Sequence, residues 1–199
     1  YHIQQSLRNA LHKVNKHVPV VTIVTQVIVD KNDSAFKNPT KPIGPFYTKE
    51  EADSFESEKG YIMKEDSGRG FRRVVASPFP KKIVEFSTIE RLLDTTICIT
   101  AGGGGIPVTL GEDGSLRGVE AVIDKDLAAE KLAEDVNADI LLILTEVEKV
   151  SINYNKPNQE DLNHISVLEA QRYLDEGHFA PGSMLPKVKA AIMFAKSSP

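Results

Sequence analysis

Two stretches of the chain are almost continuously apolar, and both predict buried strands. The first apolar run, Val18–Val29, is rich in β-branched residues, and the second apolar run, Ile140–Thr145, has the sequence ILLILT. Strands covered on both faces carry such runs, whereas strands with one wet face alternate between apolar and polar residues. A shorter buried strand is predicted at Thr96–Thr100. We expect these three segments to lie in one mainly parallel sheet.

Elsewhere, apolar residues recur at the three-to-four-residue spacing of a helix that buries one face. The predicted helices lie in residues 3–14, 48–58, 81–93, 127–136, 167–174 and 186–195. Thr48 and Glu51 have the spacing of a capping box, and Asp126 is expected to cap the helix that follows it. A hairpin is predicted from 108–110 to 115–120, and a further strand at 119–123. The alternation of strands and helices favours an α/β sandwich with a largely parallel sheet.

Residues 30–80 differ in texture from the rest of the chain. They contain five prolines, several glycines and mixed charge, and only short strands are predicted, at Tyr61–Lys64 and Phe71–Val75. We interpret 1–199 as one domain, with 30–80 as a subdomain that is inserted into it and protrudes from it.

Composition excludes several classes of protein. Of the 199 residues, 41% are hydrophobic and the formal net charge is only -4, which excludes disorder as the main state. The sequence pI of about 5.8 disfavours a nucleic-acid partner. Cys98 is the single cysteine, and the five histidines lack metal-ligand spacing, so neither a disulfide framework nor a zinc-type site is expected. No apolar stretch approaches the roughly 18 residues that span a bilayer, so we expect no membrane partner and a cytoplasmic location.

A run of four glycines, Gly102–Gly105, directly follows the predicted strand at Thr96–Thr100. Glycines free the backbone to take positive φ angles and to approach a ligand, and successive N–H groups can form a nest for an anion. A tight turn is the alternative, but a turn requires only one or two glycines. The run is neither a Walker loop nor a dinucleotide-binding fingerprint.

Two lysines lie at predicted helix starts. Lys125 stands between Asp124 and Asp126, and Lys187 follows Pro186, which suits a first helical turn. A lysine there opposes the helix dipole unless an anion binds, so the pair suggests that a phosphate is held and transferred. The aspartates could hold the lysines or take a magnesium-bridged phosphate. A solvated cap and two unrelated surface lysines are the alternatives.

Other charged residues give weaker indications of a binding or catalytic role. Arg69, Arg72 and Arg73 could clamp an anionic substrate, although such arginines more often pair with nearby carboxylates. Lys41, in a proline-rich loop, has the character of a solvated lysine. We interpret His178 as a hydrogen-bonded structural histidine.

Several long motifs in the same order resemble the carbamate kinase branch of the amino-acid kinase family. They are Ile3–Gln5, Phe36–Tyr47, Glu65–Val75, Gly102–Val108, Gly118–Asp126 and Gly177–Phe179. The resemblance implies a three-layer α/β/α sandwich with a protruding subdomain. It also implies reversible phosphoryl transfer between ATP and carbamate, with carbamoyl phosphate feeding ATP synthesis in arginine fermentation. ATP or ADP with Mg2+ and a homodimer are further implications.

The resemblance also assigns roles to individual residues. It implies that Lys125 and Lys187 contact phosphates, that Asp124 organises the lysines and that Lys41 reaches the transferred group. The residues implied to lie near the nucleotide are Asp126, Tyr154, Met184 and Pro186, and Gly102–Gly105 would shape the floor of the site.

The sequence also departs from that family. The family has a strand and a Gly-Gly-Asn loop before its first helix and continues past its helix at Pro186–Ala195, so we expect that this chain lacks both ends. Leu185 stands where the family has glycine, and Glu146 where it has aspartate. Two hypotheses follow: a working carbamate kinase, or a truncated or degenerate homologue that folds but is inactive. A kinase for another small acid is a third, which the motifs at Phe36–Tyr47 and Glu65–Val75 disfavour.

Overall fold

The computed structural model describes residues 1–66 and 68–197, and it divides the first apolar run into two strands. β1 (Val20–Thr22) pairs in parallel with β7 (Ile97–Ile99), whereas β2 (Gln26–Val29) belongs to a separate four-stranded sheet. The prediction of one strand through Val29 is therefore wrong. The three residues between β1 and β2 carry the chain from one sheet to the other.

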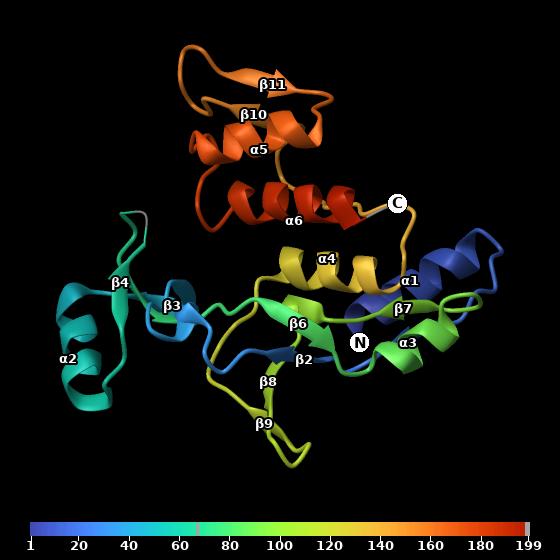
Figure 1. Cartoon of the computed structure of the whole chain (residues 1–199), viewed down its shortest axis with the longest axis horizontal. Helices are drawn as coiled ribbons and strands as arrows, with labels where there is room; N and C mark the ends of the chain where they lie inside the picture. Colours follow the sequence, from blue (N-terminus) through green and yellow to red (C-terminus); the bar gives the residue numbers. More distant parts are fainter. Residues whose placement is uncertain (67, 198–199) are drawn as a thin grey trace.

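The four-stranded sheet has the order β6-β2-β8-β9 and supports the main core (Figure 1). β2 is parallel to β8 (Ile106–Leu110) and antiparallel to β6 (Pro80–Ile83), and β8 forms the predicted hairpin with β9 (Leu116–Gly118). The first core cluster consists of Val27, Val29, Ile83, Ile89, Ile123 and Ala128. The sheet is mixed rather than mainly parallel.

Two further predictions near this sheet need correction. Residues 80–83 form β6, so the helix predicted from Lys81 shortens to α3 (Phe86–Leu92), because pairing with β2 draws 80–83 into the sheet. Residues 119–123 form no strand; a single bridge joins Ala121 to Ala76.

The second apolar run is not a strand. Ile140, Leu142 and Leu144 are 78%, 77% and 80% exposed, and no backbone hydrogen bond joins 140–145 to another described segment. Strand pairing requires a neighbour whose N–H and C=O groups face the run. The described residues supply no such neighbour here, so the prediction is wrong.

The helices lie close to their predicted positions. α1 (His2–Lys13) buries none of its residues, however, so the apolar face expected there is not buried. α4 (Lys125–Asp135) packs against α6 (Met184–Ser197) (Figure 1). α5 (Val167–Asp175) begins with a capping box between Ser166 and Glu169. With the short strands β10 (Val150–Ile152) and β11 (Glu160–Leu162), α5 and α6 enclose the second core cluster: Ile152, Ala170, Phe179, Val188 and Ile192.

A small unit projects to the left of the four-stranded sheet in Figure 1. This projecting unit, residues 41–75, contains β3 (Lys41–Tyr47), α2 (Lys49–Lys59), β4 (Met63–Glu65) and β5 (Phe71–Val75) in the sheet order β3-β5-β4. The capping box of Thr48 and Glu51 is confirmed. Pro42 and Pro45 lie in β3, an edge strand, where a missing N–H leaves fewer ladder bonds unmade.

The remaining points concern the start of the projecting unit, the domain division and membrane-spanning helices. A 3-10 turn (η1, Ser34–Phe36) precedes it, and Ser67 of the quoted motif lies outside the described residues. The division of 1–199 into one domain with a subdomain at 30–80 stays a prediction. Among the described residues, no helix has the length and apolar character that crossing a membrane requires.

Candidate functional site

The start of α4 forms the centre of the candidate site. Asp124 caps the helix by accepting a hydrogen bond from the N–H of Asp126 at 2.9 Å, and Lys125 is the first helical residue. The predicted cap, Asp126, lies instead inside the first turn, where an acid favours the helix dipole. The cap moves back by two residues because the Asp124 carboxylate already reaches the free N–H groups of that turn.

Each of the two aspartates holds a lysine from a distant part of the chain. Lys41 Nζ, from β3, lies 2.8 Å from Asp124 Oδ2, and Lys187 Nζ, from α6, lies 3.0 and 3.2 Å from the oxygens of Asp126. Both aspartates are 7% exposed. Lys125, between them, forms no ion pair with a described residue. The cluster therefore keeps one positive charge that its own carboxylates do not neutralise.

Electrostatics keep Asp124 charged. Burial alone would raise the pKa of this carboxyl, but the Lys41 hydrogen bond and charge and the N–H groups of Asp126 and Leu127 outweigh burial and lower the pKa. At neutral pH a carboxylate therefore stays available to hold Lys41 at the start of α4.

A cavity of about 520 Å3 opens beside this cluster. Four of the predicted nucleotide-site residues line it: Lys125, Tyr154, Met184 and Lys187. Two do not: Asp126 acts through its bond to Lys187, and Pro186 is buried within α6.

Sequence reasoning missed other residues of the same lining. Thr145, Glu146 and Lys149 line the cavity, and of these only Glu146 was noted in the sequence, as a departure from the family's aspartate. His178 also lines it, while its Nε2 lies 3.1 Å from Glu176 and its ring packs edge-on against Tyr173. The interpretation of His178 as hydrogen-bonded is confirmed, although its position beside the cavity was not foreseen.

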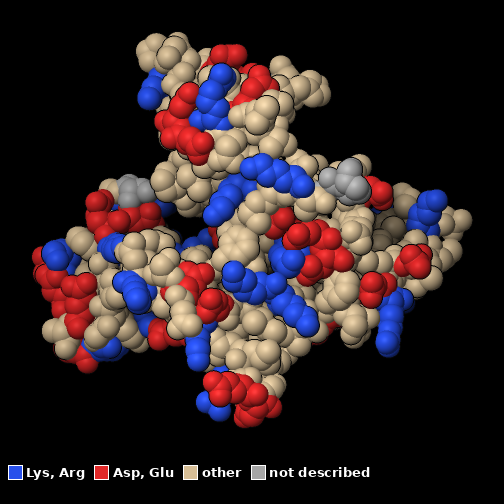
Figure 2. All heavy atoms as spheres, viewed as in Figure 1, with Lys and Arg blue, Asp and Glu red and all other residues tan. Residues whose placement is uncertain are grey.

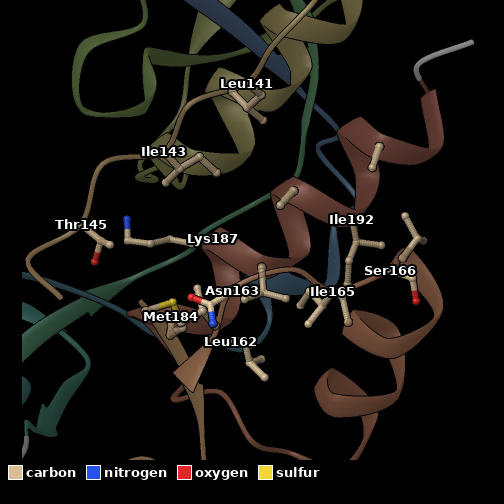
Figure 3. A pocket seen from close by; sticks show the side chains of 16 residues that line it. Leu141, Ile143, Thr145, Leu162, Asn163, Ile165, Ser166, Met184, Lys187 and Ile192 are labelled. Atoms are coloured by element: carbon tan, nitrogen blue, oxygen red, sulfur yellow. The ribbon is translucent and has the colours of Figure 1, made fainter. Parts of the chain in front are cut away.

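A second, mainly apolar cavity of about 400 Å3 adjoins the first (Figure 3). Leu141 and Ile143 of the second apolar run lie on one side of it and α6 on the other. The two cavities share Thr145, Met184 and Lys187. Lys187 therefore lies between a mainly apolar cavity and a cavity that also has other charged residues in its lining.

The glycine run forms a tight loop against the same helix start. Gly103, Gly104 and Gly105 have φ angles of 71°, 118° and 81°. A Cβ at Gly104 would overlap the carbonyl oxygen of Ile123, and one at Gly105 would overlap Val27. The close approach to Ile123 places the loop beside Asp124, whereas Gly102 and Gly103 face open space. More than one of the four glycines is therefore required by this geometry.

The arginines of the projecting unit are engaged elsewhere. Arg72 lies 3.3 Å from Asp66, Arg69 lies 3.7 Å from the same carboxylate, and Arg73 pairs with Glu120. These arginines therefore pair with carboxylates, which was the alternative to an anion clamp. On the face shown in Figure 2, acidic and basic side chains are intermixed, without a basic stripe.

Comparison with known proteins establishes the class to which this fold and site belong. The model of the amino acid kinase family matches residues 69–199, and the chain belongs to that family. It is 60% identical to the carbamate kinase of Clostridium perfringens over 199 residues, which are 99% of this chain and 63% of that protein. It is 58% identical to the carbamate kinase of Pyrococcus furiosus, over 98% of this chain and 62% of that protein.

The solved structures agree with this assignment. The carbamate kinase of Giardia lamblia bound to AMP-PNP matches with a TM-score of 0.87 and 46% identity, over 98% of this chain and 62% of that chain. The α/β amino-acid kinase fold implied by the sequence motifs is thereby confirmed. The chain spans about 63% of the length of the curated relatives it matches.

Proposed function

We propose that this chain acts as a carbamate kinase, which transfers a phosphoryl group reversibly between ATP and carbamate. The observation that carries the proposal is the convergence of Lys41, Lys125 and Lys187 at the start of one helix, beside the cavity that Tyr154 lines. These lysines come from three separate elements: two carboxylates hold Lys41 and Lys187, and Lys125 is the first residue of that helix. Phosphoryl transfer needs such an arrangement, because its catalysis consists of positioning and of stabilising charge on oxygen.

In the proposed reaction, a β-phosphate oxygen of ADP attacks the phosphorus of carbamoyl phosphate. The new P–O bond completes ATP while the bond to the carbamate oxygen breaks, and carbamate leaves with the electron pair. Negative charge shifts between the two oxygens and spreads over the transferred group. Ammonium groups act here as compact, mobile point charges.

Each lysine has a proposed role that follows from its position. Lys125 and Lys187 line the larger cavity and would neutralise the phosphates of the nucleotide. Lys41, held by Asp124, would reach the transferred phosphoryl group from the projecting unit. Asp124 would thus set the position of Lys41, and Asp126 that of Lys187.

The remaining proposed site residues shape the space around the phosphates. Tyr154 and Met184 line the cavity and would contact the nucleotide outside its phosphates, and Pro186 would fix the start of α6. Gly102–Gly105 would form the floor near the transferred group.

Leu185, which replaces a glycine of the family, packs against the second core cluster and is not part of the cavity lining. Its isobutyl group therefore does not by itself argue against phosphate binding.

Mg2+ fits this site only together with the nucleotide. The described residues contain no cluster of three histidine, cysteine or acidic side chains that could hold a metal, and the carboxylates of Asp124 and Asp126 bond to lysines. Mg2+ commonly binds through phosphate oxygens, waters and one or two carboxylates. When bound, the ion would supply further charge neutralisation at the phosphates.

We also propose that the protein is a cytoplasmic homodimer and that its reaction forms part of arginine fermentation.

Two measurements test the proposal: calorimetric titration with ADP and a coupled assay of ATP formation from ADP, Mg2+ and carbamoyl phosphate. Lys125→Ala and Lys187→Ala each remove a charge-assisted contact of about 1.5–3 kcal/mol, so ADP binding should weaken about 10- to 150-fold. Lys189→Ala is the matched control, because this lysine of α6 contacts the ring of Phe79 and is not part of the cavity lining. The control variant should bind ADP like the wild type.

The outcomes separate the two hypotheses. ATP formation that both lysine variants lose supports the working kinase. ADP binding without ATP formation supports the folded but inactive homologue. An absence of nucleotide binding would overturn both.

A further inference from the structure

We propose that Thr25 is a positioning residue for the glycine loop, a role that rests on the proposed kinase function. Its hydroxyl accepts a hydrogen bond from the N–H of Ala101 at 2.9 Å and donates one to the carbonyl of Ile23 at 2.9 Å. Its own carbonyl accepts from the N–H of Ile106 at 2.8 Å. One residue thus ties down both ends of the segment that contains Gly102–Gly105.

The topology explains why one residue can do this. The chain crosses from the sheet of β1 and β7 to the sheet of β2 and β8 twice: once through Ile23–Thr25 and once through residues 100–105. Since β1 is parallel to β7 and β2 is parallel to β8, the two connections run side by side. Thr25 lies in the first connection and bonds to the second.

Burial of Thr25 makes the loss of its hydroxyl costly. Thr25 is 4% exposed, so water cannot readily replace its hydroxyl as the partner of the Ala101 N–H. Ala101 itself has a φ angle of 49°, which a residue with a side chain adopts only when its surroundings hold it there. The Thr25 hydroxyl is one of the groups that hold it.

The shape of the glycine loop matters because the loop exposes free backbone N–H groups. The N–H groups of Gly102 and Gly103 bond to no described residue, and the Cα positions of both glycines face open space. The same loop lies against Ile123, directly before Asp124 and Lys125. Free, fixed N–H groups beside a lysine cluster suit the phosphate or carboxyl oxygens of the smaller substrate, carbamoyl phosphate. Thr25 would therefore control the position of this substrate more than that of ADP.

Three variants test this role. Thr25→Val keeps the shape but removes the hydroxyl, Thr25→Ser keeps the hydroxyl, and Thr22→Val is the control, because Thr22 is an exposed residue of β1. Misplacement of preorganised donors lowers turnover by about 10- to 100-fold. We expect that loss in kcat/KM for carbamoyl phosphate in Thr25→Val, with the KM for ADP within about twofold of wild type. Thr25→Ser should recover most of the activity, and the control should match the wild type.

A second measurement does not depend on activity. Amide hydrogen exchange at Ala101 should be faster by about tenfold or more in Thr25→Val than in Thr25→Ser, because the Ala101 N–H loses its hydroxyl acceptor. The Ile106 N–H bonds to the backbone carbonyl of Thr25, which both variants keep, so it serves as the internal reference. Wild-type exchange in Thr25→Val would overturn the proposal even if the chain made no ATP. Equal losses for ADP and carbamoyl phosphate would show a general structural defect instead. Absence of ATP formation in the wild type, with fast exchange in the variant, would reject the kinase function but keep the loop contact.

Discussion

The two apolar runs of the sequence adopt different structures: part of the first is a buried strand, and the second is an exposed segment outside the sheets. In the first, Val27 is fully buried between β6 and β8, and its neighbours share the first core cluster. In the second, the alternate residues Ile140, Leu142 and Leu144 are exposed and the backbone joins no sheet. Propensity alone does not explain the difference, because the second run also contains two isoleucines and a threonine, which favour strands.

What separates the two runs is the presence of partners. β2 finds one strand on each side, so that its N–H and C=O groups are bonded and its side chains are covered. The second run has α6 on one side only, through Leu141 and Ile143. A strand is therefore a property of the sheet that receives it as much as of its own residues.

The largest contrast is expected from placing a charge in each run. Val27→Asp buries a carboxylate without a partner in the first core cluster, and the chain should no longer fold. Leu142→Asp places the same charge in solvent and should leave the free energy of unfolding within about 0.5 kcal/mol of wild type. Circular dichroism and urea unfolding of both variants provide the measurement. If Val27→Asp still folds, the conclusion that the first run is buried and the second is exposed is contradicted.

A smaller contrast is expected from truncation to alanine. Ile83, which pairs with Val27 and is fully buried, should lose about 2–5 kcal/mol of stability as Ile83→Ala through lost burial and a cavity. Ile140→Ala removes the same atoms from an exposed site and should cost less than about 0.5 kcal/mol. Equal shifts in the urea midpoints would mean that Ile140 is covered in solution.

The third contrast concerns acid and is the smallest. Ile123 of the first core cluster directly precedes Asp124, whose pKa is lowered. A lowered carboxyl pKa contributes stability above the unfolded value of about 3.9, and that contribution is lost as pH falls through the folded value. Asp124→Asn should therefore be less stable than wild type at pH 7, and the difference should begin to shrink as the pH falls below about 4.

Urea midpoints measured from pH 7 to pH 3 check this narrowing of the difference. Leu142→Ala is the control and should follow the wild-type curve at every pH, because Leu142 is exposed and uncharged. A constant difference between wild type and Asp124→Asn across the range would show that the carboxylate is not the acid-sensitive group.

Local signals along the sequence predicted local structure well. The spacing of Thr48 and Glu51 predicted a capping box that is present, and the helices at 167–174 and 186–195 needed only small changes at their ends. The break between β1 and β2 could not be foreseen, because Thr25 differs from its neighbours only through contacts with residues 101 and 106. Such contacts join segments about 80 residues apart and leave no periodicity.

The candidate site was predictable in part for the same reason. Lys125 and Lys187 each stood at a helix start, which is a local signal. The bond between Lys41 and Asp124 is not local, and Lys41 alone had the character of a solvated lysine. Only the resemblance to a family linked that lysine to the site. Glu146 was noted only as a departure from the family, and Lys149 had no signal, since a cavity forms only after the chain has folded.

The exposed second apolar run also affects the association of separate molecules of this chain. Residues 140–145 contain no charge, proline or glycine, and their backbone groups are unpaired, so the segment has the features of a template for intermolecular strand pairing. Asp139 and Glu146 flank it directly and act as charged gatekeepers that oppose stacking. The negative charges at the two ends of this hexapeptide therefore oppose the association of separate molecules through it.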